Sequence, residues 1–527
     1  MLQEECKEKI LSEEYRDFMM RDTGALGKNF PLENGCRIPL KYGFELFYID
    51  QSEDRKKSLA DYPYTMVPKC YTTLDMAAIQ QAGIAAVQNI PGLELSGEGV
   101  LVGIIDTGIN YLDPIFRNLD GSTRIQRIWD QEEQSGTAPR GIGYGSEYTK
   151  EQINQAILSE NPKETVPSFD TDGHGTFVAS VACGGANPEN LFIGAAPEAE
   201  MVIVKLKEAK EYLREYYFVD RDAGCYQEND LVAAVFYLQK VQEELKRPLV
   251  ICLAVGTSFG GHGGYSILSE YLQNVAASEG IGIVTGSGNE ADKRHHYLGI
   301  LEQENNLPVE INVGNNTRGF VMELWTELPN LLALSIASPT GQTVGPISLK
   351  RGIGEYVFVF EQTRVIFNYR VLVETTGAQL AFFQFERPGS GIWKIIPETL
   401  ELGNGIFHIW LPMEEFLTGN VYFIRANPEY TVMEPGDTGA VVCAAYYNGK
   451  ENSIAVSSGR GYTRSNLIKP DFTAPGVRIT GASGEDRWVT RSGSSAGTAV
   501  AAGAVALLTE WILEQPGAKG VNSSQIR

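Results

Sequence analysis

The sequence predicts an α/β fold, with a central, mostly parallel sheet covered by helices on both faces and an all-β domain inserted into it. Continuous apolar runs are typical of strands buried on both faces of such a sheet, and they occur at 100–105, 201–204, 249–253 and 281–284. Helical patterns separate these runs, at 176–182, 230–245 and 267–278. From about residue 305 to 432, period-two patterns broken by Gly, Pro and Asn instead predict a β-sandwich or jelly roll.

These changes of pattern divide the chain. Residues near the N-terminus are mixed and charged, with one strand-like run at 43–50, and a helix is expected at 72–90. We expect the insert to lie outside the parallel sheet, because the α/β pattern resumes after it. The predicted parts are an N-terminal segment (1–65), the α/β domain in two pieces (66–304 and 433–527) and the inserted β domain (305–432).

Composition narrows the classes of function. The 527 residues carry a formal net charge of -22, which argues against nucleic-acid binding because phosphate contacts need clustered Lys and Arg. No uninterrupted apolar stretch reaches the length of a membrane span, so no membrane insertion is expected. The charged start of the chain lacks the apolar core of a signal peptide, which favours a cytoplasmic over a classically secreted protein.

The seven cysteines are widely spaced, and no Cys-x-x-Cys pair indicates a zinc site or a redox motif. We therefore expect reduced thiols, with Cys252 acting as a buried apolar residue within its strand. No cluster of metal-ligating residues is visible along the chain, and the sequence predicts neither a metal nor a cofactor.

Two candidate catalytic residues stand where buried strands end or helices begin. Asp106 follows the apolar run 100–105, and functional groups in α/β sheets gather at those carboxyl ends. Its alternative role is to cap the turn that follows. His174 lies between two glycines at the start of a predicted helix, where its imidazole is expected to be exposed. The chain has only five histidines, so this placement is informative. Its alternative role is that of a capping or core histidine.

Two further candidate catalytic residues also stand after a buried strand or at the start of a helix. Ser495 opens a helix of small residues, whose N-terminus places positive partial charge beside the hydroxyl. A simple helix-capping serine is the alternative. Asn289 follows the buried run 281–284 and offers an amide donor to a developing oxyanion. Its alternative is an asparagine in a left-handed turn.

Together these motifs resemble those of the subtilisin-like serine proteases, the subtilases, in the chain order Asp, His, Asn, Ser. The matching stretches cover residues 97–300 and 439–515; they are Asp106–Gly108, Gly173–Thr176, Gly288–Asn289, Gly194–Pro197, Lys469–Gly476 and Ser492–Leu508. Two positions depart from the pattern: Ser494 stands where the family usually has Thr, and Ala499 where it usually has Pro. Both changes are expected to adjust the site without abolishing it, because a hydroxyl is kept and the restored N–H lies in the first helical turn.

The resemblance implies a subtilisin-like three-layer fold and a serine endopeptidase acting on a protein or peptide. It implies a triad of Asp106, His174 and Ser495, with Asn289 in the oxyanion hole. It also implies a pro-segment, which residues 1–65 would supply in reduced form and which would stay bound. The residues that would line the substrate cleft are Val255, Gly256, Gly286, Ser287 and Gly288.

Within the family, the stretches 121–131 and 294–297 and the β insert resemble clostridial germination proteases of the Csp type, which process a zymogen of a spore-cortex lytic enzyme. This resemblance implies zymogen processing and a spore-associated location. Two alternatives remain open. One is a pseudoprotease that signals or binds, since some Csp-type triads have decayed. The other is a carbohydrate- or partner-binding module that acts through the β insert.

Overall fold

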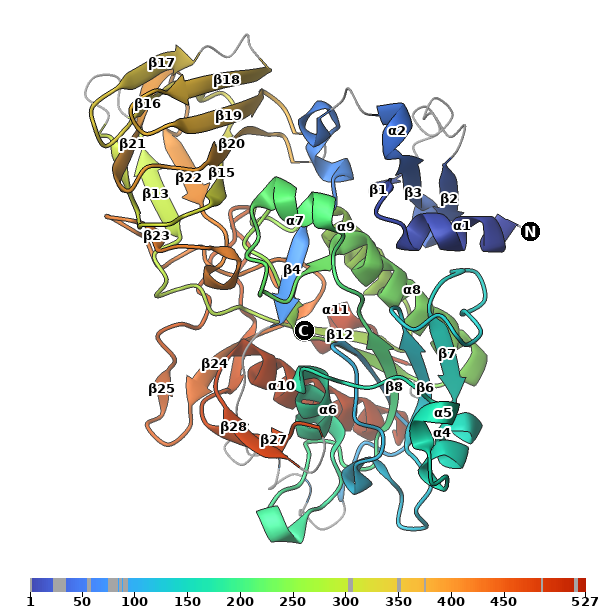
Figure 1. Cartoon of the computed structure of the whole chain (residues 1–527). Helices are drawn as coiled ribbons and strands as arrows, with labels where there is room; N and C mark the ends of the chain where they lie inside the picture. Colours follow the sequence, from blue (N-terminus) through green and yellow to red (C-terminus); the bar gives the residue numbers. More distant parts are fainter. Residues whose placement is uncertain are drawn as a thin grey trace.

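The computed structural model describes residues 2–21, 35–54, 58–73, 84, 88, 93–301, 307–347, 352–373, 376–484, 487–515 and 520–527 (Figure 1). The α/β domain is built on a nine-stranded sheet in the order β25-β24-β12-β10-β5-β8-β6-β7, with β26 paired to β24. All pairs are parallel except β7 and β25, which are antiparallel at the two ends. The strands are β5 Leu101–Asp106, β6 Ile125–Asp130, β7 Ser146–Thr149, β8 Glu200–Lys205, β10 Leu249–Leu253, β12 Ile281–Gly286, β24 Val442–Asn448, β25 Ser453–Ile454 and β26 Phe472–Pro475.

Helices cover both faces of this sheet. In β5, Val102 and Ile104 pack into one buried cluster, while Leu101 and Ile105 pack into another. The first cluster includes α6 (His174–Cys183) and α10 (Ser494–Leu513), and the second includes α8 (Glu228–Leu245) and α9 (Ile267–Val275). Because both faces are buried, these strands are continuous apolar runs, and the predicted α/β class is confirmed.

The helix α10 is rich in small and apolar residues. Among the described residues it is the one helix long and apolar enough to cross a membrane by length and composition. Most of it is buried, and it contacts α6, β10, β12 and β24. Its apolar surface therefore serves the core of the α/β domain.

The inserted domain consists of two antiparallel sheets, with strand orders β13-β22-β15-β20-β19-β18 and β17-β16-β21-β14-β23. A separate hydrophobic cluster lies between them. The first strand begins at His296, before residue 305, because β13 pairs with β22 near the end of the insert. The strands are β13 His296–Ile300, β14 Val309–Val313, β15 Gly319–Glu327, β16 Leu331–Ala337, β17 Thr343–Ile347, β18 Ile353–Phe358, β19 Thr363–Arg370, β20 Ala378–Glu386, β21 Gly391–Glu401, β22 Ile406–Trp410 and β23 Val421–Phe423.

The N-terminal segment has a fold of its own. Helix α1 (Leu2–Leu11) contacts a three-stranded antiparallel sheet of β1 (Tyr15–Arg21), β3 (Phe44–Asp50) and β2 (Cys36–Pro39). The expectation of reduced thiols is wrong for Cys6 and Cys36, which form a disulfide. Packing of α1 on β2 brings their Cα atoms to 5.4 Å, a separation that wide spacing in sequence did not reveal.

A short strand, β4 (Cys70–Thr73), links this segment to the α/β domain. It lies antiparallel between β11 (Val255–Gly256) and β9 (Tyr226–Gln227). The helix expected at 72–90 is not present at residues 72 and 73, which belong to β4. Ile84 and Gln88 are helical, and the rest of that range falls outside the described residues.

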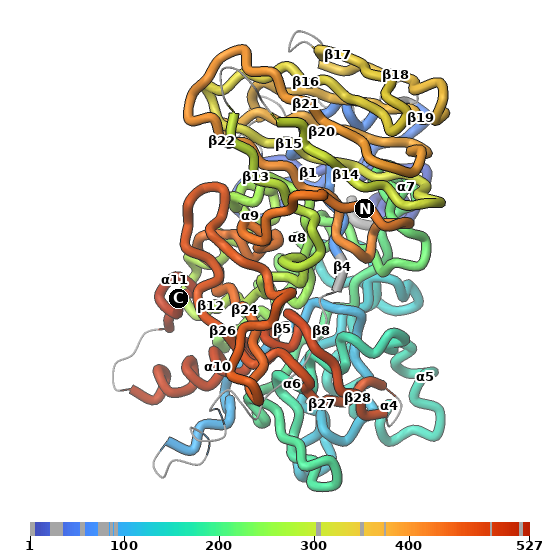
Figure 2. The backbone as a smooth tube through the Cα atoms, turned by 90° about the vertical axis from the view of Figure 1, so that its left-hand side faces the viewer, coloured from blue at the N-terminus to red at the C-terminus, as the bar shows by residue number. Residues whose placement is uncertain are grey.

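The three parts of the chain share one hydrophobic cluster. It joins Phe18 of the N-terminal sheet, Tyr217 of the α/β domain, and Trp325 and Trp410 of the insert. Figure 2 shows the insert stacked on one end of the α/β domain. The remaining helices and strands are short: α2 Gln51–Asp54, α4 Lys150–Ile157, α5 Pro162–Thr165, α7 Glu211–Tyr217, α11 Ser523–Ile526, β27 Ile479–Ala482 and β28 Trp488–Arg491.

Candidate active site

Asp106 is the last residue of β5, at the centre of the parallel sheet. Its side chain is fully buried, and its Oδ1 accepts a hydrogen bond from the Thr107 N–H at 2.8 Å. Oδ1 also lies 2.6 Å from Nδ1 of His174. A buried carboxylate at this distance fixes the orientation of the imidazole and stabilises its positive charge.

His174 is the first residue of α6, and two glycines give it this position. Gly173 has φ +86°, a left-handed conformation that favours glycine. A Cβ at Gly175 would lie 2.2 Å from the Gly108 carbonyl oxygen, so only glycine lets α6 approach the end of β5 this closely. The second ring nitrogen, Nε2, lies 3.1 Å from Ser495 Oγ.

Ser495 lies in the first turn of α10, and its hydroxyl is fully buried. The Oγ atom also lies 3.3 Å from the Ala254 carbonyl oxygen, at the start of the β11 segment. The first N–H groups of a helix have no partner within it, and they place positive partial charge beside the hydroxyl. Three segments far apart in sequence thus bring Asp106, His174 and Ser495 into one hydrogen-bonded row.

Asn289 lies beside the same helix end. Its Oδ1 accepts a hydrogen bond from the Ser494 N–H at 3.0 Å, while Ser494 Oγ accepts one from the Gly288 N–H at 3.0 Å. These reciprocal bonds hold the 288–289 backbone against α10 and leave the Asn289 NH₂ group to donate. The hydroxyl of Ser494, a departure from the usual threonine, therefore has a structural partner.

The predicted cleft residues form two backbone segments near Ser495. Val255 and Gly256 form β11 and pair antiparallel with β4. Gly286 ends β12, and Ser287 and Gly288 continue it toward Asn289. Gly288 has φ +86°, so this turn also requires glycine.

Asp170 is a buried carboxylate beside the site, which the sequence reasoning did not single out. Its Oδ1 accepts hydrogen bonds from Thr107 Oγ1 (2.9 Å) and the Gly173 N–H (2.8 Å). Its Oδ2 accepts from the Thr176 N–H and Oγ1 (2.8 and 2.6 Å). The carboxylate thus ties the loop after β5 to the start of α6. Its place four residues before His174, near a helix N-terminus, was the available signal.

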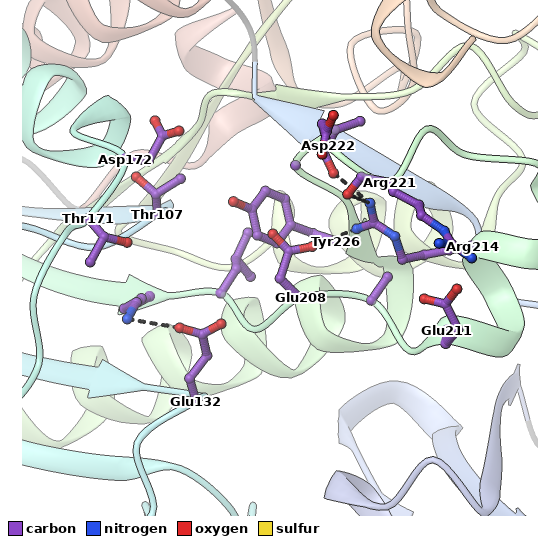
Figure 3. A pocket seen from close by; sticks show the side chains of 15 residues that line it. Thr107, Glu132, Thr171, Asp172, Glu208, Glu211, Arg214, Arg221, Asp222 and Tyr226 are labelled. Atoms are coloured by element: carbon purple, nitrogen blue, oxygen red, sulfur yellow. Dashed lines mark hydrogen bonds and ion pairs between the residues drawn. The ribbon is translucent and has the colours of Figure 1, made fainter. Parts of the chain in front are cut away.

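A cavity of about 780 Å³ opens beside Thr107 and Asp172 (Figure 3). Two ion pairs lie within its wall, Lys205 with Glu132 at 2.9 Å and Arg214 with Glu208 at 2.8 Å. Tyr226 of β9 also lines it, so the cavity adjoins the strand that pairs with β4. The space is polar and lies near the candidate triad, since Thr107 follows Asp106 and Asp172 lies two residues before His174.

Among the residues that the structure describes, no group of three or more His, Cys, Asp and Glu side chains could hold a metal ion. The chemistry open to the site is that of a serine hydroxyl, an imidazole and a carboxylate in hydrogen-bonded order, beside amide donors at a helix end.

Known proteins are similar to this chain in sequence and in fold. The profile of the subtilase family matches residues 97–318 and 403–520. The solved structure of the Clostridium perfringens CspB protease has a TM-score of 0.71 and 30% identity to this chain, covering 82% of this chain and 87% of that one. The subtilisin-like protease SBT3.3 of Arabidopsis thaliana is 22% identical over 92% of this chain and 66% of its own length. For SBT2.2 of the same plant, the identity is 33% over 18% of this chain and 12% of that protein.

The chain thus spans at most about two thirds of the length of these curated plant relatives. The matched residues include the segments that carry Asp106, His174, Asn289 and Ser495. The match is interrupted between residues 318 and 403, within the β insert. The chain therefore belongs to the subtilase family.

Proposed function

We propose that this protein is a serine endopeptidase with Asp106, His174 and Ser495 as its catalytic triad. The row of hydrogen bonds from Asp106 through His174 to Ser495 carries the proposal. His174 takes the proton as Ser495 Oγ bonds to the substrate carbonyl carbon. His174 then gives that proton to the leaving amine as the peptide bond breaks. Water, activated by the same imidazole, hydrolyses the acyl-enzyme and restores the serine.

The oxyanion of each tetrahedral intermediate would accept hydrogen bonds from the Asn289 side chain and the Ser495 N–H. The contact between Asn289 Oδ1 and the Ser494 N–H supports this role, because it directs the carboxamide before substrate arrives. A donor fixed in this way is worth about 3–4 kcal/mol in the transition state.

We further propose that the N-terminal segment stays bound, with β4 in the place of a substrate strand. Two buried ion pairs support this: Lys69 with Glu228 at 3.5 Å, and Lys210 with Asp17 at 2.5 Å. Asp17 also accepts a hydrogen bond at 2.7 Å from Gln227, which belongs to β9, the strand that pairs with β4. Buried charges of this kind are costly to separate, so cutting the chain after β4 would leave the segment in place.

The physiological substrate we propose is a protein zymogen, on the strength of the resemblance to Csp-type proteases. An inactive member of the family, acting by binding alone, is the competing function. A fluorophosphonate probe, which bonds only to an activated serine, distinguishes the two on the purified full chain. Labelling is expected for the wild type and for Ser492→Ala, an exposed serine three residues before the nucleophile. It should be absent from Ser495→Ala.

N-terminal sequencing of the same samples adds a second readout. In wild type we expect a new N-terminus shortly after β4, which Ser495→Ala should lack. A wild-type chain that neither takes the probe nor cuts itself would support the binding-only function instead.

A further inference from the structure

Lys69 is the residue directly before β4, and its side chain is buried. Its carbonyl oxygen accepts a hydrogen bond from the Glu228 N–H at 3.0 Å, which extends the pairing of β4 with β9 by one residue. The Glu228 carboxylate accepts a hydrogen bond from the Lys69 N–H at 3.2 Å and lies 3.5 Å from the Lys69 ammonium. The pairing that places β4 therefore also fixes the position of Lys69.

Three buried carboxylates lie around this ammonium, and none of them belongs to the N-terminal segment. Glu228 begins α8, Glu323 lies on β15 of the insert, and Glu434 follows the insert. Glu323 and Glu434 meet at Gly260: its N–H donates to Glu323 Oε2 at 3.1 Å, and a Cβ there would lie 2.3 Å from Glu434 Oε1. Burial raises the pKa of these two carboxyls, and the positive charge of Lys69 opposes the rise. The body of the protein thus supplies the acidic groups of the cluster.

The N-terminal segment supplies the positive charge. The Lys69 ammonium lies 4.8 Å from the centre of the Tyr64 ring, which belongs to the same segment. Arg464 is a second positive neighbour of Glu434, but it pairs with Glu327. If the segment leaves, the carboxylates lose their ammonium partner. Because unpaired buried carboxylates are costly, the vacated place favours another basic group.

A substrate strand that replaced β4 would meet this cluster at a defined distance from the cut. Thr73 lies opposite Val255, four residues after Lys69. The next residue of such a strand would lie opposite Ala254, whose carbonyl oxygen is 3.3 Å from Ser495 Oγ. Ser495 is therefore expected to attack the carbonyl of the residue five positions after the one in the place of Lys69.

We propose that Glu228, Glu323 and Glu434 form a recognition site for one basic side chain of the substrate. Its ligand is a lysine or arginine five positions before the residue that contributes the scissile carbonyl. A neutral or acidic residue in that position would leave the buried carboxylates unpaired. The site holds Lys69 while the segment is bound and selects the strand that replaces it. The inference rests on the proposed peptidase function and specifies a feature of its substrate.

The test uses the full-length wild type and acetylated hexapeptide anilides that copy residues 69–74, with serine in place of Cys70. The first residue is lysine, arginine, norleucine or glutamate, and release of the anilide reports cutting after the last residue. We expect kcat/KM for the lysine peptide to exceed that for the norleucine peptide at least about tenfold, because leaving one partner of a buried charge pair unpaired is costly. The glutamate peptide should be cut least.

Three variants locate the preference. Glu228→Gln removes the charge that contacts the ammonium and should remove most of the difference between the lysine and norleucine peptides. Glu211→Gln, at an exposed carboxylate of α7, is the matched control and should keep the wild-type ratio. Lys69→Met removes the segment's own ligand for the site. It should raise the cutting of every peptide and keep the preference for lysine.

Fluorophosphonate labelling of the same samples separates the possible failures. If Ser495 takes no probe, the peptidase function is wrong and the inference falls with it. If the wild type takes the probe but cuts the lysine and norleucine peptides equally well, or cuts none of the series, the inference alone is overturned. Because the series is cut by the unaltered wild type, misfolding of a variant cannot imitate the expected result.

Discussion

In the α/β domain, Asp106 ends β5, His174 begins α6, and Asn289 accepts a hydrogen bond from Ser494 at the start of α10, so the three gather around Ser495. In the β insert, Glu323 instead lies inside a junction, where it accepts hydrogen bonds from Tyr64, Gly260 and Trp325. These donors come from the N-terminal segment, the α/β domain and the insert itself. The difference teaches that the polar groups assigned to the proposed reaction lie together at strand and helix ends, whereas a polar group such as Glu323 joins the three parts of the chain.

The largest effect is expected from removing a buried charge that joins two parts of the chain, and this change should lower the free energy of unfolding. Asp17→Ala leaves the buried Lys210 ammonium without its carboxylate, and loss of one partner of such a pair costs about 3–5 kcal/mol. We expect chemical denaturation to show this loss and hydrogen exchange to show faster exchange in β1. Glu8→Ala, at an exposed carboxylate of α1, should change stability by less than about 0.5 kcal/mol. An Asp17→Ala protein as stable as this control would show that the pair does not hold the segment.

Asn289, which is proposed to act in the reaction, should affect turnover and not stability. Asn289→Ala should lower kcat by about 100- to 1,000-fold with little change in KM, because the donor acts mainly on the transition state. Asn289→Asp keeps the acceptor for the Ser494 N–H but removes the donor, and should lower kcat at least as far. Asn274→Ala, on α9, is the matched control and should retain wild-type kinetics. A change confined to KM would instead assign Asn289 to ground-state binding.

The smallest predicted effect is a pH dependence of stability, which Glu323 causes at the junction of the three parts. Burial raises the pKa of the Glu323 carboxyl from 4.5 to about 7, so the folded protein favours the protonated form. The stability that this group contributes is complete below pH 4.5 and is lost as pH rises to about 7, by up to about 3 kcal/mol. Glu323→Gln is neutral at every pH and should flatten this part of the curve. Denaturant unfolding at pH 5 and pH 7.5 measures the slope.

The control for this comparison is Glu215→Gln, at an exposed carboxylate of α7, whose slope should match the wild type. An unchanged slope in Glu323→Gln would mean that Glu323 does not couple the junction to pH.

Much of the α/β domain could be predicted, because strands that are buried on both faces consist of continuous apolar residues, as at 249–253. The candidate catalytic residues followed from one local rule, their position at strand or helix ends. The place of Met433 beside Gly288 could not be predicted, because it depends on a backbone hydrogen bond to Ser287, far away in sequence. The Cys6–Cys36 bond was missed for the same reason, since it depends on how α1 packs on β2. The short strand β4 was hidden within an apparent helical pattern, because its partners β9 and β11 decide its conformation.

The hydrogen bond between His174 and Ser495 joins residues that are 321 positions apart. During synthesis, the histidine emerges first, the whole β insert follows, and the serine comes after the insert. A growing chain therefore carries the imidazole and the carboxylate through that interval without Ser495 beside them. Under the proposed peptidase function, this order prevents self-digestion and damage to neighbouring nascent chains during the interval. The proposed cut after β4 can begin only once α10 has left the ribosome and docked.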